Sequence, residues 1–435
     1  MSNELKEEIT KLAKIIFECI GSIKLKYYYK SVPKIKTRDY GYSLNYEEVP
    51  DYFITFYQNC NEHFQKLDLT ELNNLFKKDY PFFKNYIKTR QGGGSSSPKD
   101  FLLVIIVSLF SKNTNQSNFD LLLFDELKGI SDIFEKKKTF TRQYHPIKNL
   151  SYIEDLAEHK IQEGVLVKKL SDDEINNFIG MDSYFHKSNL DYYAIVFDYY
   201  EEIGFSEDET LNNPKLIQEI PNILELFLYS LNLTTKGGFL FNTVHTLHLD
   251  YFSHFSGMTT SSSYATDSPH NYRLNKEDFN NWCEKYNELS HLKLEHFKLA
   301  LSRLSEAERR LNPIDSIIDS VIGLESILLN DIGNKKTQGE LRFRFALNYA
   351  SLFLKEDRYN KRKFANDIYD LRSSIVHGSQ KLGQRININN KDYNLEMISG
   401  EINKMLRDTI NHLIKLPANN NFYSDGYWIK KVLNL

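Results

Sequence analysis

The side chains of this chain best suited to chemistry are Arg372 and His377, which stand five positions apart in the segment Tyr369–Gly378. Arginine is a permanent cation whose planar guanidinium group binds phosphate oxygens through paired hydrogen bonds. Histidine gains and loses a proton near neutral pH and can therefore serve as a general acid or base. Together the two side chains supply two of the groups that are needed to cleave an RNA backbone without a metal ion.

The surrounding sequence predicts an amphipathic helix over about residues 360–377. Its apolar positions fall on one stripe, which should face a core: Phe364, Ile368, Leu371 and Ile375. On an ideal helix His377 lies almost opposite this stripe, and Arg372 lies at the edge of the stripe, about 140° from His377. Gly378 is a typical residue to end the helix. Ser373 and Asp370 share the polar face with His377 and are the expected supporting residues.

Basic residues accompany this segment and are the expected RNA contacts: Arg342, Arg344, Arg358, Lys361, Arg362 and Lys363. One cluster also contains Lys355 and opens the same helix, and the other also contains Lys335 and Lys336 and brackets the helix before it. Charged runs are more often solvated faces than binding sites, so this alternative stays open. The formal net charge of −3 excludes a uniformly basic surface, and any RNA contact must come from local patches.

Composition predicts a folded protein of two or three domains, with 435 residues, 41% apolar and 26% charged. The three cysteines are widely spaced, which favours reduced thiols and a cytoplasmic location. The longest apolar run, Phe101–Phe110, is too short to cross a bilayer and indicates a buried strand or a core helix. The charged N-terminus lacks the apolar core of a signal peptide, and no membrane contact is expected.

The order of patterns predicts an α+β protein with a mixed α/β N-terminal domain over 1–257 and a C-terminal α-helical bundle over 277–435. Helices are expected over 4–20 and 214–231, and strands within 25–60, 164–170 and 192–198. Residues 91–98 predict a flexible surface loop and a subdomain edge near 91–100. Residues 258–276 read as a linker. Beyond it, helices are expected over 277–310, from Pro313 to near Gly333 with Asn312 as its cap, and over about 338–354, 360–377 and 395–416.

His245 and His248 could be metal ligands if their segment were helical, with Asp250 and His254 close by. The alternation of the segment favours a strand, which would separate the two histidines. The sequence has no phosphate-binding glycine loop followed by lysine. No metal and no cofactor are therefore expected.

The Arg-x4-His element resembles the active-site motif of HEPN ribonucleases, and in particular the Apea-like HEPN branch found in bacterial abortive-infection proteins. It is embedded here as Tyr369-x-x-Arg372-Ser373-x-x-Val376-His377-Gly378. Three further stretches fit the resemblance: Arg309-Arg310-x-Asn312-Pro313, Gly323–Leu328 and Glu340–Arg344. The similarity covers about residues 278–416. Ser373 departs from it, because many HEPN enzymes have Asn after the arginine.

The resemblance implies a metal-independent endoribonuclease that uses the 2′-hydroxyl of RNA as an internal nucleophile. His377 would be the general acid or base, and Arg372 would bind the scissile phosphate. Glu325, in the Gly323–Leu328 stretch, is a further supporting candidate. The family pairs two such helices across a dimer interface, so a homodimer or higher homo-oligomer with a composite active site is expected.

The resemblance also implies a role in anti-phage defence by abortive infection, as a toxin whose targets are tRNA or messenger RNA. The N-terminal domain would restrain the ribonuclease or sense a phage-derived trigger. The alternative function is a non-catalytic HEPN module that binds a nucleotide or a partner and regulates it.

Overall fold

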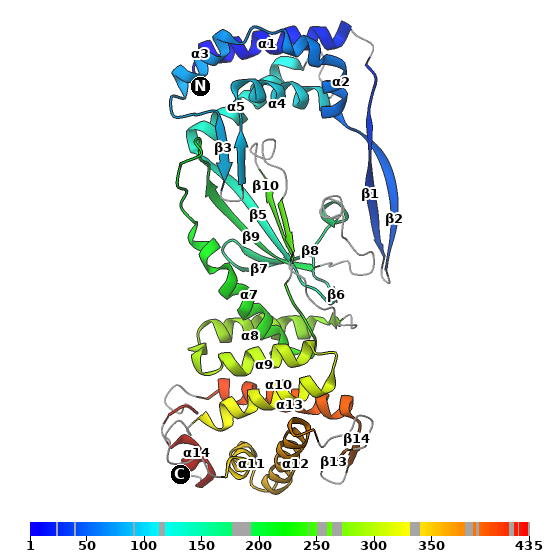
Figure 1. Ribbon diagram of the computed structural model, residues 1–435, viewed down its shortest axis with the longest axis vertical. Coiled ribbons are helices and arrows are strands. Elements are labelled where there is room, and N and C mark those ends of the chain that lie inside the picture. The colour runs from blue at the N-terminus through cyan, green and yellow to red at the C-terminus, as the bar shows by residue number, and fades with distance from the viewer. Residues whose placement is uncertain are drawn as a thin grey trace. The chain divides into compact units, whose positions relative to one another are not determined.

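The computed structural model describes residues 1–22, 25–38, 41–89, 92–112, 118–175, 193–241, 243–249, 259–262, 272–330, 340–378, 386–388, 391–416, 422–424 and 426–433. Its N-terminal region combines sheets and helices, and its region from about 276 to 433 is mostly helical (Figure 1). The predicted α+β class is confirmed.

Contacts within the chain define two units that alternate along the sequence. The first contains Met1–Pro146, Ala157–Ile220 and Asn242–Ser263, and the second contains Ile147–Leu156, Pro221–Phe241 and Tyr264–Leu435. The sequence predicted a single boundary at residue 257. Each unit instead consists of three separate segments of the chain. Helix α7 (Lys215–Thr234) begins in one unit and ends in the other.

The first unit opens with helices α1 (Asn3–Ser22), α2 (Tyr52–Gln65), α3 (Thr70–Asp79), α4 (Pro98–Ser111) and α5 (Phe119–Lys136), which share one apolar core. The apolar run Phe101–Phe110 lies in α4 and is therefore a core helix. The predicted helix over 4–20 is confirmed by α1, which buries Leu5, Ile9, Leu12 and Ile16 and leaves Ile15 exposed.

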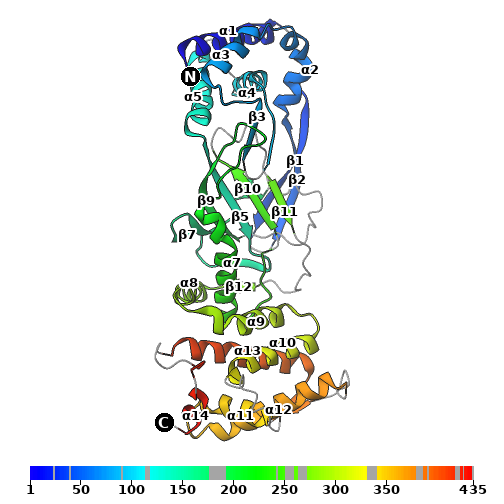
Figure 2. The same ribbon diagram turned by 60° about the vertical axis from the view of Figure 1, so that its left-hand side comes forward.

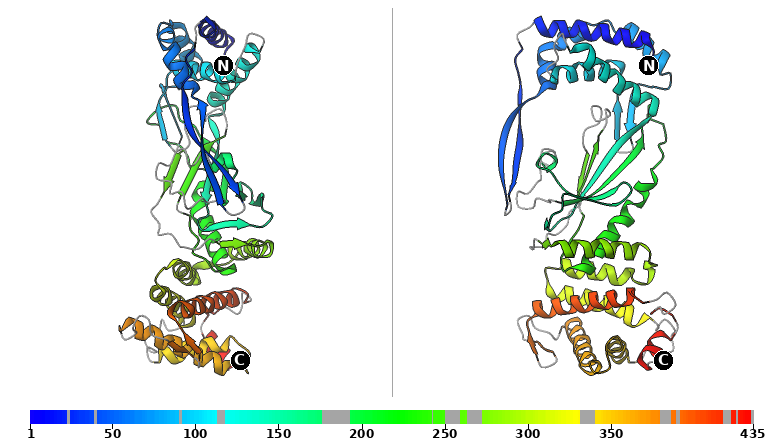
Figure 3. Two further views of the ribbon diagram at one scale, coloured as in Figure 1. Left: turned by 90° about the vertical axis from the view of Figure 1, so that its right-hand side faces the viewer. Right: turned by 180° about the vertical axis from the view of Figure 1, so that it is seen from behind.

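Two expectations for this unit are wrong. Strand β4 (Gly92–Ser95) pairs with β3 (Tyr86–Thr89) inside the segment predicted as a loop, because strand pairing uses backbone groups that glycine also carries. The Tyr-rich segment forms strands β1 (Tyr29–Arg38) and β2 (Gly41–Pro50) but then becomes α2 (Figure 3). Asp51 starts this helix by accepting a hydrogen bond from the Ile54 amide at 2.9 Å.

A six-stranded antiparallel sheet completes the first unit. Its strand order is β11 (Thr259–Ser262), β10 (Thr243–His248), β5 (Lys138–Pro146), β9 (Tyr193–Glu202), β8 (Val165–Lys169) and β7 (Glu158–Gln162). Strands β8 and β9 confirm the predictions over 164–170 and 192–198. Strand β11 lies within the segment expected to be a linker and forms the edge of this sheet.

The helices of the second unit lie in three layers (Figures 1 and 2). One contains α8 (Lys276–Ser290) and α9 (Lys298–Arg309), the next α10 (Pro313–Leu328) and α13 (Leu395–Ile414), and the last α11 (Leu341–Ser351), α12 (Arg358–Val376) and α14 (Tyr427–Leu433). The second unit also contains two small sheets of two strands each. Strand β6 (Leu150–Ile153) pairs with β12 (Tyr272–Leu274), and β13 (Ile386–Ile388) pairs with β14 (Lys391–Tyr393).

The start of α10 is as predicted, with the Asn312 side chain accepting a hydrogen bond from the Ile314 amide at 3.0 Å and Pro313 in the first turn. The single helix expected over 277–310 is wrong, because the chain breaks between α8 and α9. The break contains a short 3-10 helix, Leu294–His296, and then Phe297, which is buried against Phe422 with ring centroids 4.9 Å apart. Tertiary packing of Phe297 therefore overrides a continuous helical pattern.

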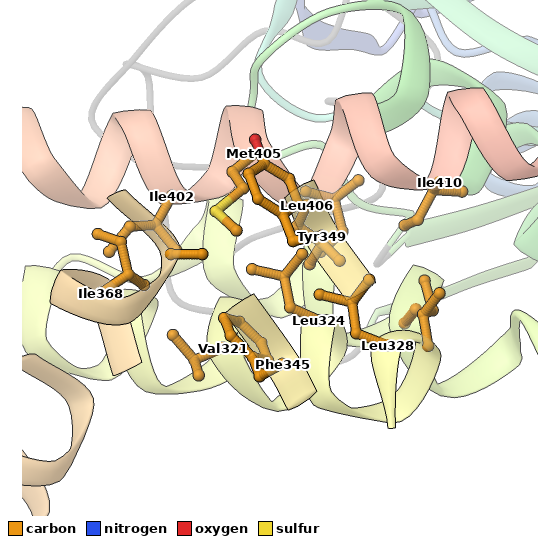
Figure 4. Packing of buried hydrophobic residues seen from close by; sticks show 14 of the residues in the cluster. Val321, Leu324, Leu328, Phe345, Tyr349, Ile368, Ile402, Met405, Leu406 and Ile410 are labelled. Atoms are coloured by element: carbon orange, nitrogen blue, oxygen red, sulfur yellow. The ribbon is translucent and has the colours of Figure 1, made fainter. Parts of the chain in front are cut away.

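The core of the second unit lies between α10 and its neighbours. Figure 4 shows side chains from four helices interleaved there: Val321, Leu324, Leu328, Phe345, Tyr349, Ile368, Ile402, Met405, Leu406 and Ile410. Ten such side chains from α10, α11, α12 and α13 make these helices one packed body. The rotation of α12 is consequently fixed by its apolar stripe.

We expect the first unit to lose stability in acid because of His145. Its imidazole is buried in the sheet with Nε2 lacking a hydrogen-bond partner, and burial lowers its pKa from 6.5 to about 4, with His245 contributing. The unfolded chain binds this proton more readily, so stability is full above pH 6.5 and is lost as the pH falls towards 4. The full effect is roughly 3 kcal/mol at about 1.4 kcal/mol per pKa unit.

Hydrogen exchange of the β5 amides at pH 7 and pH 4.5 measures this effect. Wild type should lose more protection between the two pH values than His145→Asn, which carries no titrating ring. His159→Asn, at an exposed position, is the control. Equal losses in wild type and His145→Asn would contradict the assignment.

Candidate functional site

Helix α12 holds Arg372 and His377 as the helical pattern predicts. Ile368 and Leu371 are buried, and Phe364 and Ile375 pack against the same core. His377 is exposed. The predicted orientation of this helix is therefore confirmed.

His377 stands at the last turn of α12, where the backbone leaves the helix. Its amide donates to the Ser373 carbonyl at 3.0 Å, and the Gly378 amide donates to the Ile375 carbonyl at 3.0 Å. Gly378 has φ of +70°, a left-handed conformation that glycine adopts without strain. The helix therefore ends at this point and presents the imidazole at an exposed corner.

The surroundings of Arg372 pair only part of its hydrogen-bond donors and hold its charge only loosely. Its side chain is 29% exposed, and its Nη2 lies 3.8 Å from Oε2 of Glu325 on α10, which is an ion pair beyond hydrogen-bond reach. Its Nε is buried and has no hydrogen-bond partner. Arg372 therefore keeps unused donors beside a carboxylate that holds it only loosely.

Burial and charge oppose each other at this carboxylate. Burial raises the pKa of Glu325, while Arg372 and a hydrogen bond from Tyr369 act to lower it. Burial also raises the pKa of the Tyr369 hydroxyl, and the Glu325 charge adds to this rise. Tyr369 thus joins the site as a neighbour of both charged groups, which its position three residues before Arg372 could have suggested.

The other supporting candidates lie around this centre without meeting at one point. Asp370 forms an ion pair with Arg342 of α11, and both side chains are about half exposed. Ser373 is half-buried, and its carbonyl accepts the His377 amide. The structure therefore groups Glu325, Tyr369 and Arg372, and it places Asp370 with Arg342.

The predicted RNA contacts in the described residues come from two helices, α12 and α11. Near the start of α12, Arg358 Nε donates to the Phe353 carbonyl at 3.1 Å, and Lys361 lies 4.6 Å from the Phe353 ring centroid. The Arg362 guanidinium lies 5.2 Å from the Phe343 ring centroid. Lys363 and Arg344 are half-buried on α12 and α11. Lys335 and Lys336 are outside the described residues.

The sheet of the first unit contains a buried polar cluster that was not predicted from the sequence. The Thr141 hydroxyl donates to Glu201 Oε1 at 2.7 Å and lies 3.1 Å from His248 Nδ1. Both Glu201 and His248 are buried. The signal was the alternation of β9, in which Glu201 follows Phe197 and Tyr199 on the inward face.

The two histidines considered as metal ligands lie on β10, as the alternation predicted. Their spacing of three places them on opposite faces of the strand. Asp250 and His254 fall outside the described residues. Within the described ranges, no group of three or more His, Cys, Asp or Glu side chains is arranged to hold a metal ion.

The chain matches no family model, no curated protein and no solved structure with which it was compared. The HEPN resemblance thus stays a prediction based on the motif residues. Among the helices that the structure describes, none is long and apolar enough to cross a membrane.

We expect Glu325→Gln to stabilise the second unit more at pH 8 than at pH 4. A carboxyl group whose pKa is raised on folding favours the folded state at low pH, and this contribution is lost as the pH rises through its folded pKa. The amide does not titrate and escapes this loss. Both tryptophans, Trp282 and Trp428, belong to this unit, so their fluorescence during thermal unfolding reports on it.

The predicted quantity is the Tm of the variant minus the Tm of wild type, which should increase between pH 4 and pH 8. Glu401→Gln, on the exposed surface of α13, controls for the loss of a carboxylate. A difference that decreases with pH would show that the Arg372 ion pair outweighs burial.

Proposed function

We propose that this protein is a metal-independent endoribonuclease whose second unit carries the active centre. The observation that carries the proposal is the state of Arg372, which retains unused donors five residues before an exposed histidine. Two arginines of the chain show the contrast: Arg142 meets Asp198 through two contacts of 2.6 Å, and Arg303 meets Asp319 at 2.7 Å. An arginine left with free donors at a partly exposed position is suited to an incoming phosphate.

The chemistry follows from these two groups. Arg372 binds the scissile phosphate and stabilises the negative charge that develops on it. The 2′-hydroxyl attacks the adjacent phosphorus, the bond from phosphorus to the 5′-oxygen breaks, and His377 transfers protons at the attacking or leaving oxygen. The products are a 2′,3′-cyclic phosphate and a 5′-hydroxyl end.

The site requires a second copy of the chain. Arg372 and His377 diverge by about 140° on one helix, and each proton transfer needs its own group. A two-fold dimer that brings two α12 helices together near His377 provides two histidines and two arginines. A single chain supplies one histidine and one arginine to such a site.

The cellular role that we propose is abortive infection in the cytoplasm, with tRNA or messenger RNA as the substrate. Unchecked cleavage of either RNA would arrest growth of the cell. The first unit is the proposed restraint and the proposed receptor for a phage-derived trigger. This part of the proposal rests on the HEPN resemblance.

Cleavage should disappear in His377→Ala and in Arg372→Ala, with a loss of about 100-fold or more for a general acid or base. Sequencing of RNA ends from cells that express wild type should reveal 2′,3′-cyclic phosphates at defined sites. Activity of the purified protein should persist in EDTA.

The matched control is His291→Ala, because His291 is also an exposed histidine at the end of a helix in the same unit. Equal cleavage by wild type, His377→Ala and Arg372→Ala would refute the proposal. RNA binding without any cleavage would favour the non-catalytic regulatory module.

Activity per chain should rise with protein concentration, because the site needs two copies. Val376→Arg adds a cation at an exposed position beside His377, where the two α12 helices meet, and in a two-fold dimer the added charges oppose each other. We expect at least a tenfold weaker dimer by mass photometry, with activity recovering at high protein concentration. Glu401→Arg, on the exposed face of α13, should change neither quantity. Full activity of a strictly monomeric protein would contradict the composite site.

A further inference from the structure

A small cleft in the second unit lies between α11, α12 and α14, away from the catalytic pair. It has a volume of about 200 Å³. Leu347, Ala350 and Val432 form its apolar part, and Arg358, Tyr359 and Arg362 bring polar groups from α12. Tyr359 is 76% exposed, so its ring is available beside the cleft.

The charge of this cleft differs from that of a larger groove in the same unit. None of its lining residues within the described chain is acidic. The lining of that groove, along α13, mixes both signs of charge: Glu308, Glu396, Glu401 and Asp408 with Lys236, Lys404 and Arg407. The charged lining residues of the α12 cleft are two arginines, so a polyanion should prefer it to the mixed lining of the α13 groove.

The cleft also has the side chains that contact nucleobases. Base stacking needs an exposed aromatic ring, and Tyr359 provides one. Arg362 already lies over the Phe343 ring, which is 43% exposed, and a guanidinium held in this way can face both a phosphate and a base. No ion pair of Arg362 occurs among the described residues, so its charge is not neutralised there.

The position of Tyr359 on α12 connects the cleft to His377. The two residues are eighteen positions apart, which is about five full turns at 3.6 residues per turn, so they lie on the same face of the helix. They are separated by about 27 Å at ~1.5 Å per residue. The carboxylate between them, Asp370, is paired with Arg342 and so repels a phosphate chain less.

We propose that this cleft is a nucleobase-stacking subsite for single-stranded RNA, and that the exposed face of α12 guides the strand from Tyr359 to His377. The inference rests on the proposed function, because that function makes RNA the polyanion. A strand stacked at ~3.4 Å per nucleotide spans ~27 Å with about eight nucleotides. A stacked strand of four nucleotides therefore reaches only one of the two positions.

The binding test uses full-length protein and fluorescent single-stranded RNA of four and twelve nucleotides, with His377→Ala in every variant so that the probe stays intact. Tyr359→Ala should weaken binding of the twelve-nucleotide RNA about tenfold, as expected for the loss of one stacked base. Tyr359→Phe, which keeps the ring, should bind like the parent. Arg362→Gln should reduce the slope of log affinity against log salt by about 0.7.

Two controls separate base stacking from charge and from protein docking. Polyphosphate carries charge without bases and should bind equally to the parent and to Tyr359→Ala. Leu354→Ala removes another exposed apolar side chain, from the connection between α11 and α12, and should leave RNA affinity unchanged. The subsite is refuted if Tyr359→Ala binds the twelve-nucleotide RNA like the parent. It is also refuted if Tyr359→Ala and Leu354→Ala both weaken self-association and leave RNA binding intact, because the cleft then holds a second copy.

The two proposals can fail separately. RNA binding that depends on Tyr359, in a protein whose His377 has no effect on RNA ends, supports the subsite and refutes cleavage. Cleavage that depends on His377, with a kcat/KM equal in wild type and Tyr359→Ala for long RNA, supports catalysis and refutes the subsite.

Discussion

The close approach of α10 and α13 at Gly323 determines the geometry of the second unit. A Cβ atom at this position would lie 2.7 Å from a methyl carbon of Leu406, so any larger residue would require the Leu406 side chain to move. Helix α10 also packs against α9, α11 and α12. Glu325 follows two residues after Gly323, so the depth at which α10 is seated sets the distance between this carboxylate and Arg372. The geometry of the proposed site therefore depends on a contact between apolar helix surfaces.

Arg372 shows how the bundle keeps a charged group partly unsatisfied. Complete burial of its guanidinium would require full pairing, because an unpaired buried charge is strongly destabilising. Complete exposure would leave its side chain free to adopt many conformations, and phosphate binding would then have to restrict them. The structure lies between these limits, with one loosely held carboxylate, one unpaired Nε and 29% of the side chain exposed. This arrangement limits the motion of Arg372 while leaving donors for a ligand.

The sequence was sufficient where local patterns determine the structure. The apolar stripe of α12 predicted the burial of Ile368 and the exposure of His377, and Asn312 with Pro313 predicted the start of α10. The sequence did not predict features that depend on contacts between residues far apart in the chain. The break before α9 depends on the packing of Phe297 against Phe422, and the pairing of Arg372 with Glu325 joins helices 47 positions apart. Neither contact has a local signal, and the exchange of segments between the two units has none either.

The proposed separation of RNA recognition from catalysis along α12 would have a physical advantage over a site built on loops. A helix packed by one stripe is rigid, so its opposite face presents side chains at fixed intervals of one turn. Tyr359, Arg362, Asn366, Asp370, Ser373 and His377 follow one another along this face at helical spacings of three, four and seven residues or their sums. The same stripe that buries Ile368 therefore aligns all of these positions at once. Because the apolar stripe fixes the rotation of the whole helix, core packing would set the register between the proposed base subsite and the proposed cleavage site.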